Sequence, residues 1–192
     1  MSSRKPFIVG IGGTIREGSS SEQALKLALK YAAALGAETE LVAGHDLQLP
    51  IYDPAFGTIT ETGRHLVDSL RKADGVIFAS PCYHGGVSGL VKNAIDYIEE
   101  MRSDERVYLD QRAVGAIGCG YGNQGPGMVL VQLRQMTHAL RGWPVPLGVA
   151  VNSAVVKFEA GECSEAAVAK QIEIMASQVV EFATKHIAHT GR

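Results

Sequence analysis

The sequence predicts an α/β fold, a three-layer sandwich in which a five-stranded parallel sheet has helices on both faces. Five short apolar segments alternate with segments of helical periodicity. Right-handed crossovers between parallel strands place the connecting helices on the two faces of a sheet. No repeat, linker or low-complexity stretch interrupts the alternation. The length suits one well-buried domain, so residues 1–192 are predicted to form a single domain.

The first elements follow from apolar patterning and from the residues that end each run. An apolar run rich in β-branched residues predicts a strand at 7–11. Apolar residues at three- and four-residue spacing predict a helix at 22–35, which Gly36 ends. The run 38–43 is more polar, which predicts a strand near the edge of the sheet. Residues 44–58 contain two prolines and have no sustained period, so a surface loop is predicted there.

The same patterns continue through the second half of the chain. Helical spacing predicts a helix at 60–73, and an Asp-Gly turn leads into an apolar strand at 76–80. A third helix is predicted at 89–101, and the strongly charged segment 102–112 is predicted to be a solvated connection. The remaining predicted elements are a strand at 113–118, a helix at 128–140, a strand at 143–151 and a helix at 164–187.

Composition and charge exclude several classes of protein. Apolar residues make up 46% and charged residues 20% of the chain, which is ordinary for a soluble globular protein. The formal net charge of −2 gives no concentrated basic face for nucleic acid. No apolar run is long enough to cross a membrane and no signal-type core follows the N-terminus, so a cytoplasmic location without a membrane partner is expected. Three cysteines without Cys-x-x-Cys spacing and scattered histidines predict neither disulfides nor a metal site.

Unusual loops follow the first, third and fourth predicted strands, at the sheet edge where open parallel sheets bind ligands. The loop at 12–21 carries glycines, hydroxyls and Arg16 before a helix N-terminus, whose free N–H groups and dipole suit a phosphate. A helix cap beside a solvated arginine is the alternative. The loop at 81–88 offers backbone amides beside a tyrosine and a histidine, which suits a planar polar ring. The loop at 119–127 has little bulk, so its backbone can approach the other side of such a ring.

From Ile8 to Ala150 the chain resembles the NADPH-dependent FMN reductase family of flavodoxin-like proteins. The matching residues are Gly13-Thr-Ile-Arg16 with Ser19 and Ser21, Ser80-Pro-Cys-Tyr83, Leu90-Val-Lys-Asn-Ala-Ile-Asp96, the loop at 119–127 and Gln132-Leu-Arg134. The resemblance implies a flavodoxin-like fold with strand order 2-1-3-4-5. The chain departs from the family where Thr14 replaces a common serine, and where Cys82 and His84 replace a glutamate and an asparagine.

The resemblance also implies which residues bind the cofactor. The FMN phosphate is expected at the first loop, the edge of the isoalloxazine ring at the second, and the other end of the ring at the third. The predicted cofactor-binding set is Gly13, Thr14, Arg16, Ser19, Ser20, Ser21, Pro81, Cys82, Tyr83, His84, Gly85, Cys119, Gly120, Tyr121, Gly122 and Asn123. No residue is assigned a catalytic role, because the flavin itself performs the hydride chemistry.

The implied function is reduction of FMN by hydride transfer from NADPH or NADH, with the two electrons passed on to an acceptor. One alternative is a reductase whose flavin stays bound and whose oxidant is a quinone, an azo compound or a metal oxyanion. Another is an electron-carrier flavodoxin, which passes single electrons to protein partners without nicotinamide. Such carriers are usually strongly acidic and lack an arginine in the phosphate loop, whereas this chain is near neutral and has Arg16.

The expected partners are a small-molecule acceptor or free flavin, and a flavin-using monooxygenase is a further possibility. The resemblance also implies a homodimer or homotetramer formed through the helix after the second loop. Apolar residues on more than one side of that helix are compatible with such an interface. These residues are Val91, Ile95, Tyr97 and Ile98.

Overall fold

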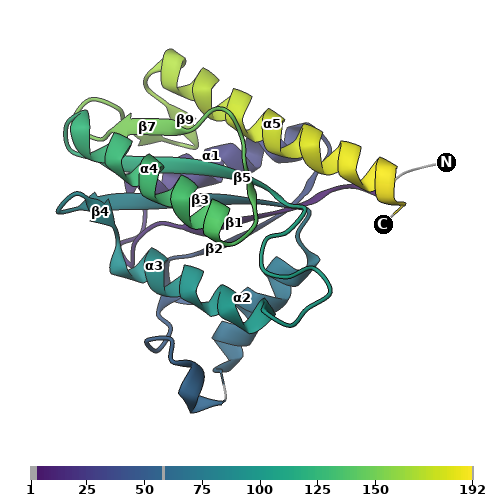
Figure 1. The fold of residues 1–192 in the computed structure, drawn as a ribbon. Coiled ribbons are helices and arrows are strands. Elements are labelled where there is room, and N and C mark those ends of the chain that lie inside the picture. Colours follow the sequence, from purple (N-terminus) through teal and green to yellow (C-terminus); the bar gives the residue numbers. More distant parts are fainter. Residues whose placement is uncertain (1–3, 58, 192) are drawn as a thin grey trace.

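The central sheet of the computed structural model has the strand order β2-β1-β3-β5-β6, and every neighbouring pair on this path is parallel (Figure 1). The structure describes residues 4–57 and 59–191. The strands on this path are β1 (Phe7–Gly12), β2 (Glu38–Ala43), β3 (Gly75–Tyr83), β5 (Ala113–Gly120) and β6 (Trp143–Pro144). β7 (Val149–Asn152) also pairs with β5, in parallel. Among the predicted strands, β5 is the fourth, and β6 and β7 together are the fifth. The predicted parallel sheet and its order 2-1-3-4-5 are therefore confirmed.

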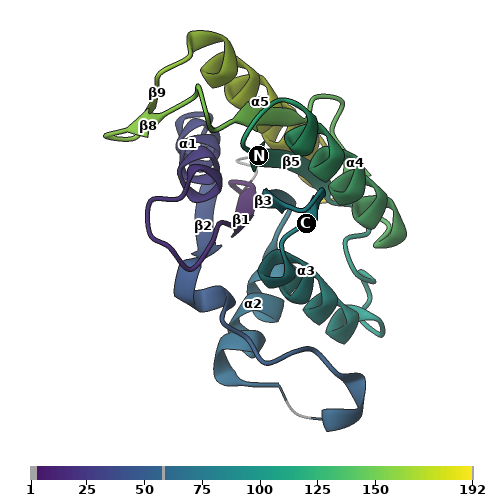
Figure 2. The same cartoon turned by 90° about the vertical axis from the view of Figure 1, so that its left-hand side faces the viewer.

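Helices cover both faces of the sheet (Figure 2). They are α1 (Ser20–Ala34), α2 (Glu61–Lys72), α3 (Gly89–Asp96), α4 (Gln124–Ala139) and α5 (Ala166–Thr190). Side chains that alternate along a strand point to opposite faces. Ile8 of β1 accordingly belongs to the core shared with α1 and α5, while Val9 belongs to the core shared with α2, α3 and α4. The sheet is thus buried on both sides, as its continuous apolar strands predict.

The predicted fifth strand at 143–151 is wrong in one respect, because it is divided into β6 and β7. Pro146 has no N–H to give to a sheet. The carbonyls of Val145 and Pro146 instead accept hydrogen bonds of 2.8 and 2.7 Å from Nη2 of Arg134 on α4. A helix side chain therefore takes the place of the strand pairing across this break.

Two boundaries near the carboxyl edge also differ from the prediction. β3 continues to Tyr83, because Cys82 and Tyr83 pair antiparallel with β4 (Gly86–Val87). His84 and Gly85 form a two-residue turn with φ of 50° and 84°, as in a tight β-hairpin. α4 begins at Gln124, four residues before the predicted start. Pro126 fits there, because the first turn of a helix does not need its N–H.

Other predicted elements are shifted or subdivided. The third predicted helix is α3 followed by a 3₁₀ helix, Tyr97–Met101. The predicted loop at 44–58 contains two 3₁₀ helices, Gly44–Leu47 and Pro54–Phe56, and Thr58 lies outside the described residues. A short hairpin of β8 (Phe158–Glu159) and β9 (Glu162–Cys163), which the sequence patterns do not predict, precedes α5.

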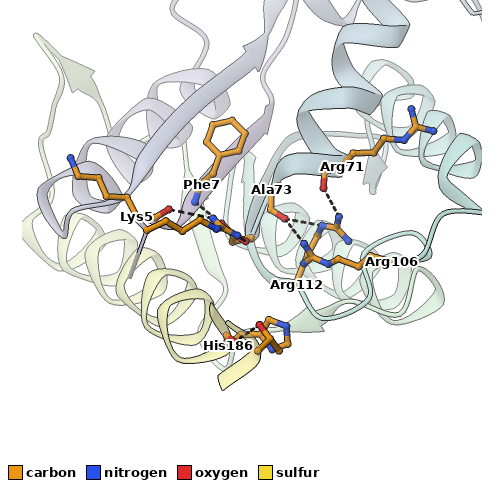
Figure 3. A network of polar contacts seen from close by, with 10 residues as sticks. Lys5, Phe7, Arg71, Ala73, Arg106, Arg112 and His186 are labelled. Carbon is orange, nitrogen blue, oxygen red and sulfur yellow. Dashed lines mark hydrogen bonds and ion pairs between the residues drawn. The ribbon is translucent and has the colours of Figure 1, made fainter. Parts of the chain in front are cut away.

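The segment 102–112 is not simply a solvated connection, because Arg112 is only 1% exposed. Its guanidinium donates to the carbonyls of Ala73 at 3.0 Å, Arg71 at 3.0 Å, Tyr108 at 3.1 Å and Asp110 at 3.2 Å. Figure 3 shows the bonds to Ala73 and Arg71. Burial lowers the pKa of Arg112 to about 9, so the group remains protonated at neutral pH. The prediction failed because an arginine can be buried when most of its five N–H groups find acceptors, as four hydrogen bonds provide here.

The apolar residues of the third predicted helix do not form a free surface. Val91, Ile95, Tyr97 and Ile98 are all buried in the core on the α2, α3 and α4 side of the sheet. Their apolar character is therefore accounted for within the chain, and it gives no support to a subunit interface at this helix. Among the described residues, no helix combines the length and apolar character needed to cross a bilayer.

Candidate functional site

A cavity of about 740 Å³ opens at the carboxyl edge of the sheet, where the segments after β1, β3, β5 and β7 meet. Its volume lies within the range of small-molecule sites. The predicted residues that line it are Gly13, Thr14, Arg16, Ser19, Ser20, Ser21, Pro81, Cys82, Tyr83, Cys119, Gly120 and Tyr121. The three predicted loops therefore do converge on one cavity.

The first loop is shaped by local hydrogen bonds of its own hydroxyl groups. Oγ of Ser19 caps α1 by accepting the N–H of Glu22 at 3.4 Å, and Oγ1 of Thr14 donates to the carbonyl of Arg16 at 3.1 Å. The carbonyl of Ser19 accepts the next N–H of the helix, from Gln23. Among the described residues, the N–H groups of Ser20 and Ser21 in the first turn have no acceptor. These two N–H groups, at the positive end of the helix dipole, are available to an anion.

The second loop is a hairpin held from both ends. Gln132 of α4 donates from Nε2 to the carbonyl of Gly85 at 2.8 Å and accepts the N–H of Val87 at 3.0 Å. At the base, Oγ of the buried Ser80 accepts the N–H of Ser88 at 3.0 Å and donates to the carbonyl of Pro81 at 2.8 Å. These bonds fix the backbone of the cavity wall that carries Cys82 and Tyr83.

The third loop is fastened to the end of β7 by Asn152. Its Oδ1 accepts the N–H of Gly122 at 2.9 Å, and its Nδ2 donates to Oδ1 of Asn123 at 2.9 Å. A Cβ added to Gly120 would lie 3.0 Å from Cβ of Cys82, so the second and third loops approach each other closely at this glycine. Because Gly120 has no side chain, the adjacent ends of β3 and β5 present little bulk to the cavity, and a flat ring can approach them closely.

Four predicted residues do not line the cavity: His84, Gly85, Gly122 and Asn123. His84 and Gly85 form the turn of the hairpin, beyond the strand residues that reach the cavity. Asn123 directly precedes α4, which begins earlier than predicted. The cavity therefore reaches less far along both loops than the predicted set does, because β3 ends later and α4 begins earlier than the sequence predicts.

Sequence reasoning missed Ser153 and Lys157, which line the cavity from the segment after β7. It also missed Ile15, Ser88, Gly89 and Leu90, which lie beside predicted residues. The sequence did contain a signal for Ser153 and Lys157. Segments that follow parallel strands meet at one edge, and the same rule applied to the end of the fifth predicted strand would have included residues 153–157.

The charges in the cavity have one sign. Arg16 and Lys157 line it, and among the described residues no aspartate or glutamate does. Burial raises the pKa of the Cys119 thiol, so this group stays neutral. No group of His, Cys, Asp and Glu in the described part of the chain is arranged to hold a metal ion. The cavity as a whole is suited to an anionic ligand that also presents a flat polar surface.

Comparison with known proteins finds a family model, "NADPH-dependent FMN reductase", that matches residues 6–155. The chain is 29% identical over 133 residues to an FMN-dependent NADPH-azoreductase of Staphylococcus aureus. That match covers 59% of this chain and 65% of the relative, so the chain spans less than two thirds of the relative's length.

Solved structures with a similar arrangement include the flavoenzyme NAD(P)H:(acceptor) oxidoreductase FerB from Paracoccus denitrificans. The TM-score is 0.69 at 20% identity, covering 94% of this chain and 98% of FerB. A flavodoxin, WrbA-like protein from Agrobacterium tumefaciens has a TM-score of 0.64 at 17% identity, with 95% and 99% of the two chains covered. These likenesses show the flavodoxin-like fold.

Proposed function

The chain belongs to the NADPH-dependent FMN reductase family, and on that premise we propose that it is an NAD(P)H-dependent flavin oxidoreductase. In this proposal FMN occupies the cavity at the carboxyl edge of the sheet, NADPH or NADH donates a hydride, and a small-molecule acceptor takes up the electrons. The observation that carries the proposal is the convergence of three loops and two cations on one cavity that lacks carboxylates among its described lining residues.

The residues present fit FMN at both ends of that molecule. The free N–H groups of Ser20 and Ser21 and the guanidinium of Arg16 suit the phosphate. The hairpin wall at Tyr83 and the lack of a side chain at Gly120 suit the flat ring. The absence of carboxylates from the described lining avoids repulsion of a ring that gains negative charge on reduction.

When bound, FMN accepts a hydride and releases electrons to an oxidant, so the chain's own residues bind, orient and shield. Gln132 and Ser80 hold the hairpin wall in place, and Asn152 holds the opposite loop. No side chain needs to move a proton in this scheme, which agrees with the neutral Cys119 thiol and the lack of an acid in the described lining.

A second candidate is a reductase that keeps its flavin bound and reduces an aromatic acceptor such as an azo compound or a quinone. Tyr83 and Tyr121 line the cavity and are 56% and 85% exposed, so their rings can contact a flat acceptor at its mouth. The azoreductase of Staphylococcus aureus is a relative with this kind of acceptor in its name.

The visible spectrum of the purified protein tests the proposal first, followed by NADPH and NADH oxidation with and without added FMN. We expect bound or bindable FMN and nicotinamide oxidation. A protein that cannot bind flavin would contradict the proposal, and flavin binding without nicotinamide oxidation would favour an electron-carrier flavodoxin. Turnover that needs an azo compound or a quinone, rather than free FMN, would favour the second candidate.

Replacing Arg16 with alanine is expected to weaken FMN binding by about 1.5 to 3 kcal/mol, because a charge-assisted contact to phosphate is lost. Fluorescence titration of flavin-free protein with FMN measures the change. Arg64→Ala, at an exposed position on α2, is the matched control and should leave the affinity unchanged. Equal affinities of wild type and Arg16→Ala would place Arg16 outside the phosphate site.

We further propose that the protein assembles as a homodimer or homotetramer, as the family resemblance implies. Sedimentation at micromolar concentration tests this, and a monomer would contradict it. A flavin-using monooxygenase is proposed as a partner only if reduced FMN leaves the protein during turnover.

A further inference from the structure

Lys157 lies beyond residues 6–155, the part of the chain that the family model matches, yet it lines the same cavity as the phosphate loop. We infer that Lys157 is a second cation for the FMN phosphate, acting together with Arg16. This inference rests on the proposed function, because it assigns a residue to the proposed FMN site. It extends that site to a hairpin outside the part of the chain that the family model matches.

The β8–β9 hairpin brings Lys157 to the side of α1. The backbone of Lys157 pairs with Ser164, whose N–H donates to the Lys157 carbonyl at 2.9 Å. Phe158, the next residue, packs on the core that contains the inner face of α1. Nζ of Lys30, on α1, donates to Glu162 at 2.6 Å. Figure 2 shows the hairpin beside α1, and the Lys30 contact lies in the second half of that helix. The link from Lys157 to the first turn of α1 is the cavity, which Ser19, Ser20 and Ser21 also line.

The ammonium group of Lys157 is available to an anion. Its Nζ donates to the Ser153 carbonyl at 2.7 Å, and an ammonium group has three N–H donors. In the described part of the chain it has no carboxylate partner. Several other lysines are each paired with a carboxylate three or four residues away: Lys26, Lys92, Lys170 and Lys185. The lysine that lines the cavity is thus one whose charge is not compensated locally.

Charge balance explains what a second cation contributes. A phosphate monoester carries about −1.5 to −2 charges at neutral pH. Arg16 supplies one positive charge, and the N-terminus of α1 supplies about half a charge. Lys157 adds one more positive charge, so that the positive charge of the site exceeds the negative charge of the phosphate by about 0.5 to 1. This surplus of positive charge favours FMN over flavins that lack the phosphate.

The test compares the binding of FMN and riboflavin to flavin-free wild type and Lys157→Gln. Riboflavin has the same ring without the phosphate, so it separates contacts to the phosphate from contacts to the ring. We expect Lys157→Gln to weaken FMN binding about tenfold, as expected for a lost charge-assisted hydrogen bond. Riboflavin binding should change less than about twofold, within the scatter of a neutral surface substitution.

Two further variants make the test specific. Lys157→Arg keeps the positive charge and should bind FMN nearly as well as wild type. Lys170→Gln makes the same charge change on an exposed part of α5, outside the cavity, and should leave FMN binding unchanged. Thermal unfolding of each variant shows whether the fold is retained.

Several results would overturn the inference while leaving the proposed function intact. Wild-type FMN affinity in Lys157→Gln would remove Lys157 from the site. An equal loss of FMN and riboflavin affinity would place it at the ring instead. An increase in KM for NADPH with unchanged FMN affinity would place it at the nicotinamide donor. A wild-type protein that binds no FMN would instead overturn the proposed function itself, and the inference with it.

Discussion

Replacing Arg112 with methionine is expected to lower the free energy of unfolding by about 3 kcal/mol. Methionine fills much of the same volume but removes the donor from the carbonyls of Arg71, Tyr108 and Asp110, and it leaves the carbonyl of Ala73 with only the 3.4 Å bond from Arg106. Each buried acceptor that loses its partner costs about 1 to 3 kcal/mol of stability. Part of this loss is offset, because the variant no longer has to remove a charged guanidinium from water. Urea denaturation followed by circular dichroism measures the change.

Two variants control for the chemistry of this substitution. Lys at position 112 retains a charge but has fewer donors in fixed directions, so Arg112→Lys should fall between wild type and Arg112→Met. Arg102→Met removes an exposed arginine from the same segment and should change stability by less than about 0.5 kcal/mol. If Arg112→Met is as stable as wild type, the four hydrogen bonds provide no net stabilisation.

Replacing Gly12 with alanine is expected to destabilise the protein by about 3 kcal/mol and to abolish measurable FMN binding. A Cβ on Gly12 would lie 2.0 Å from the carbonyl oxygen of Ala79, on the backbone of the neighbouring strand. That oxygen also accepts the N–H of Gly13, so the clash falls at the point where the phosphate loop leaves the sheet. Denaturation and FMN titration measure the two effects.

Gly127→Ala is the matched control for this substitution. Gly127 lies in α4, and no atom comes within 4 Å of a Cβ added there. Alanine should stabilise the helix by roughly 0.5 to 1 kcal/mol without changing FMN binding. Wild-type stability and affinity in Gly12→Ala would mean that the first loop can move away from β3 without consequence.

The sheet order was predictable because it depends on patterns that are local in sequence. Apolar runs such as 76–80 identify the strands, and the alternation with helices identifies parallel connections. The end of β3 was not predictable in the same way. Cys82 and Tyr83 are extended because β4 pairs with them, and a short pairing of this kind leaves little apolar pattern in the sequence.

The same distinction applies to the candidate site. Gly13 to Ser21 could be predicted because a glycine-rich turn before a helix has a local sequence pattern. Lys157 could not, because its place at the cavity depends on the packing of a hairpin against α1, about 130 residues away in sequence. The burial of Arg112 likewise depends on carbonyls that the fold brings together, and its charged neighbours in sequence suggest the opposite.

The hydrogen bonds from Gln132 make the hairpin sensitive to the number of residues in the turn and less sensitive to the side chains of those residues. Gln132 binds backbone groups of Gly85 and Val87, so these bonds do not depend on the chemistry of the side chain at position 84. The φ of 50° at His84 does restrict that position to residues that tolerate it. An insertion or deletion there would shift the pairing by one residue and exchange the faces of the strand. Histidine and asparagine both tolerate a positive φ, so either residue at position 84 is compatible with the cavity wall. Position 84 can thus be exchanged among residues that tolerate a positive φ while the wall keeps its shape.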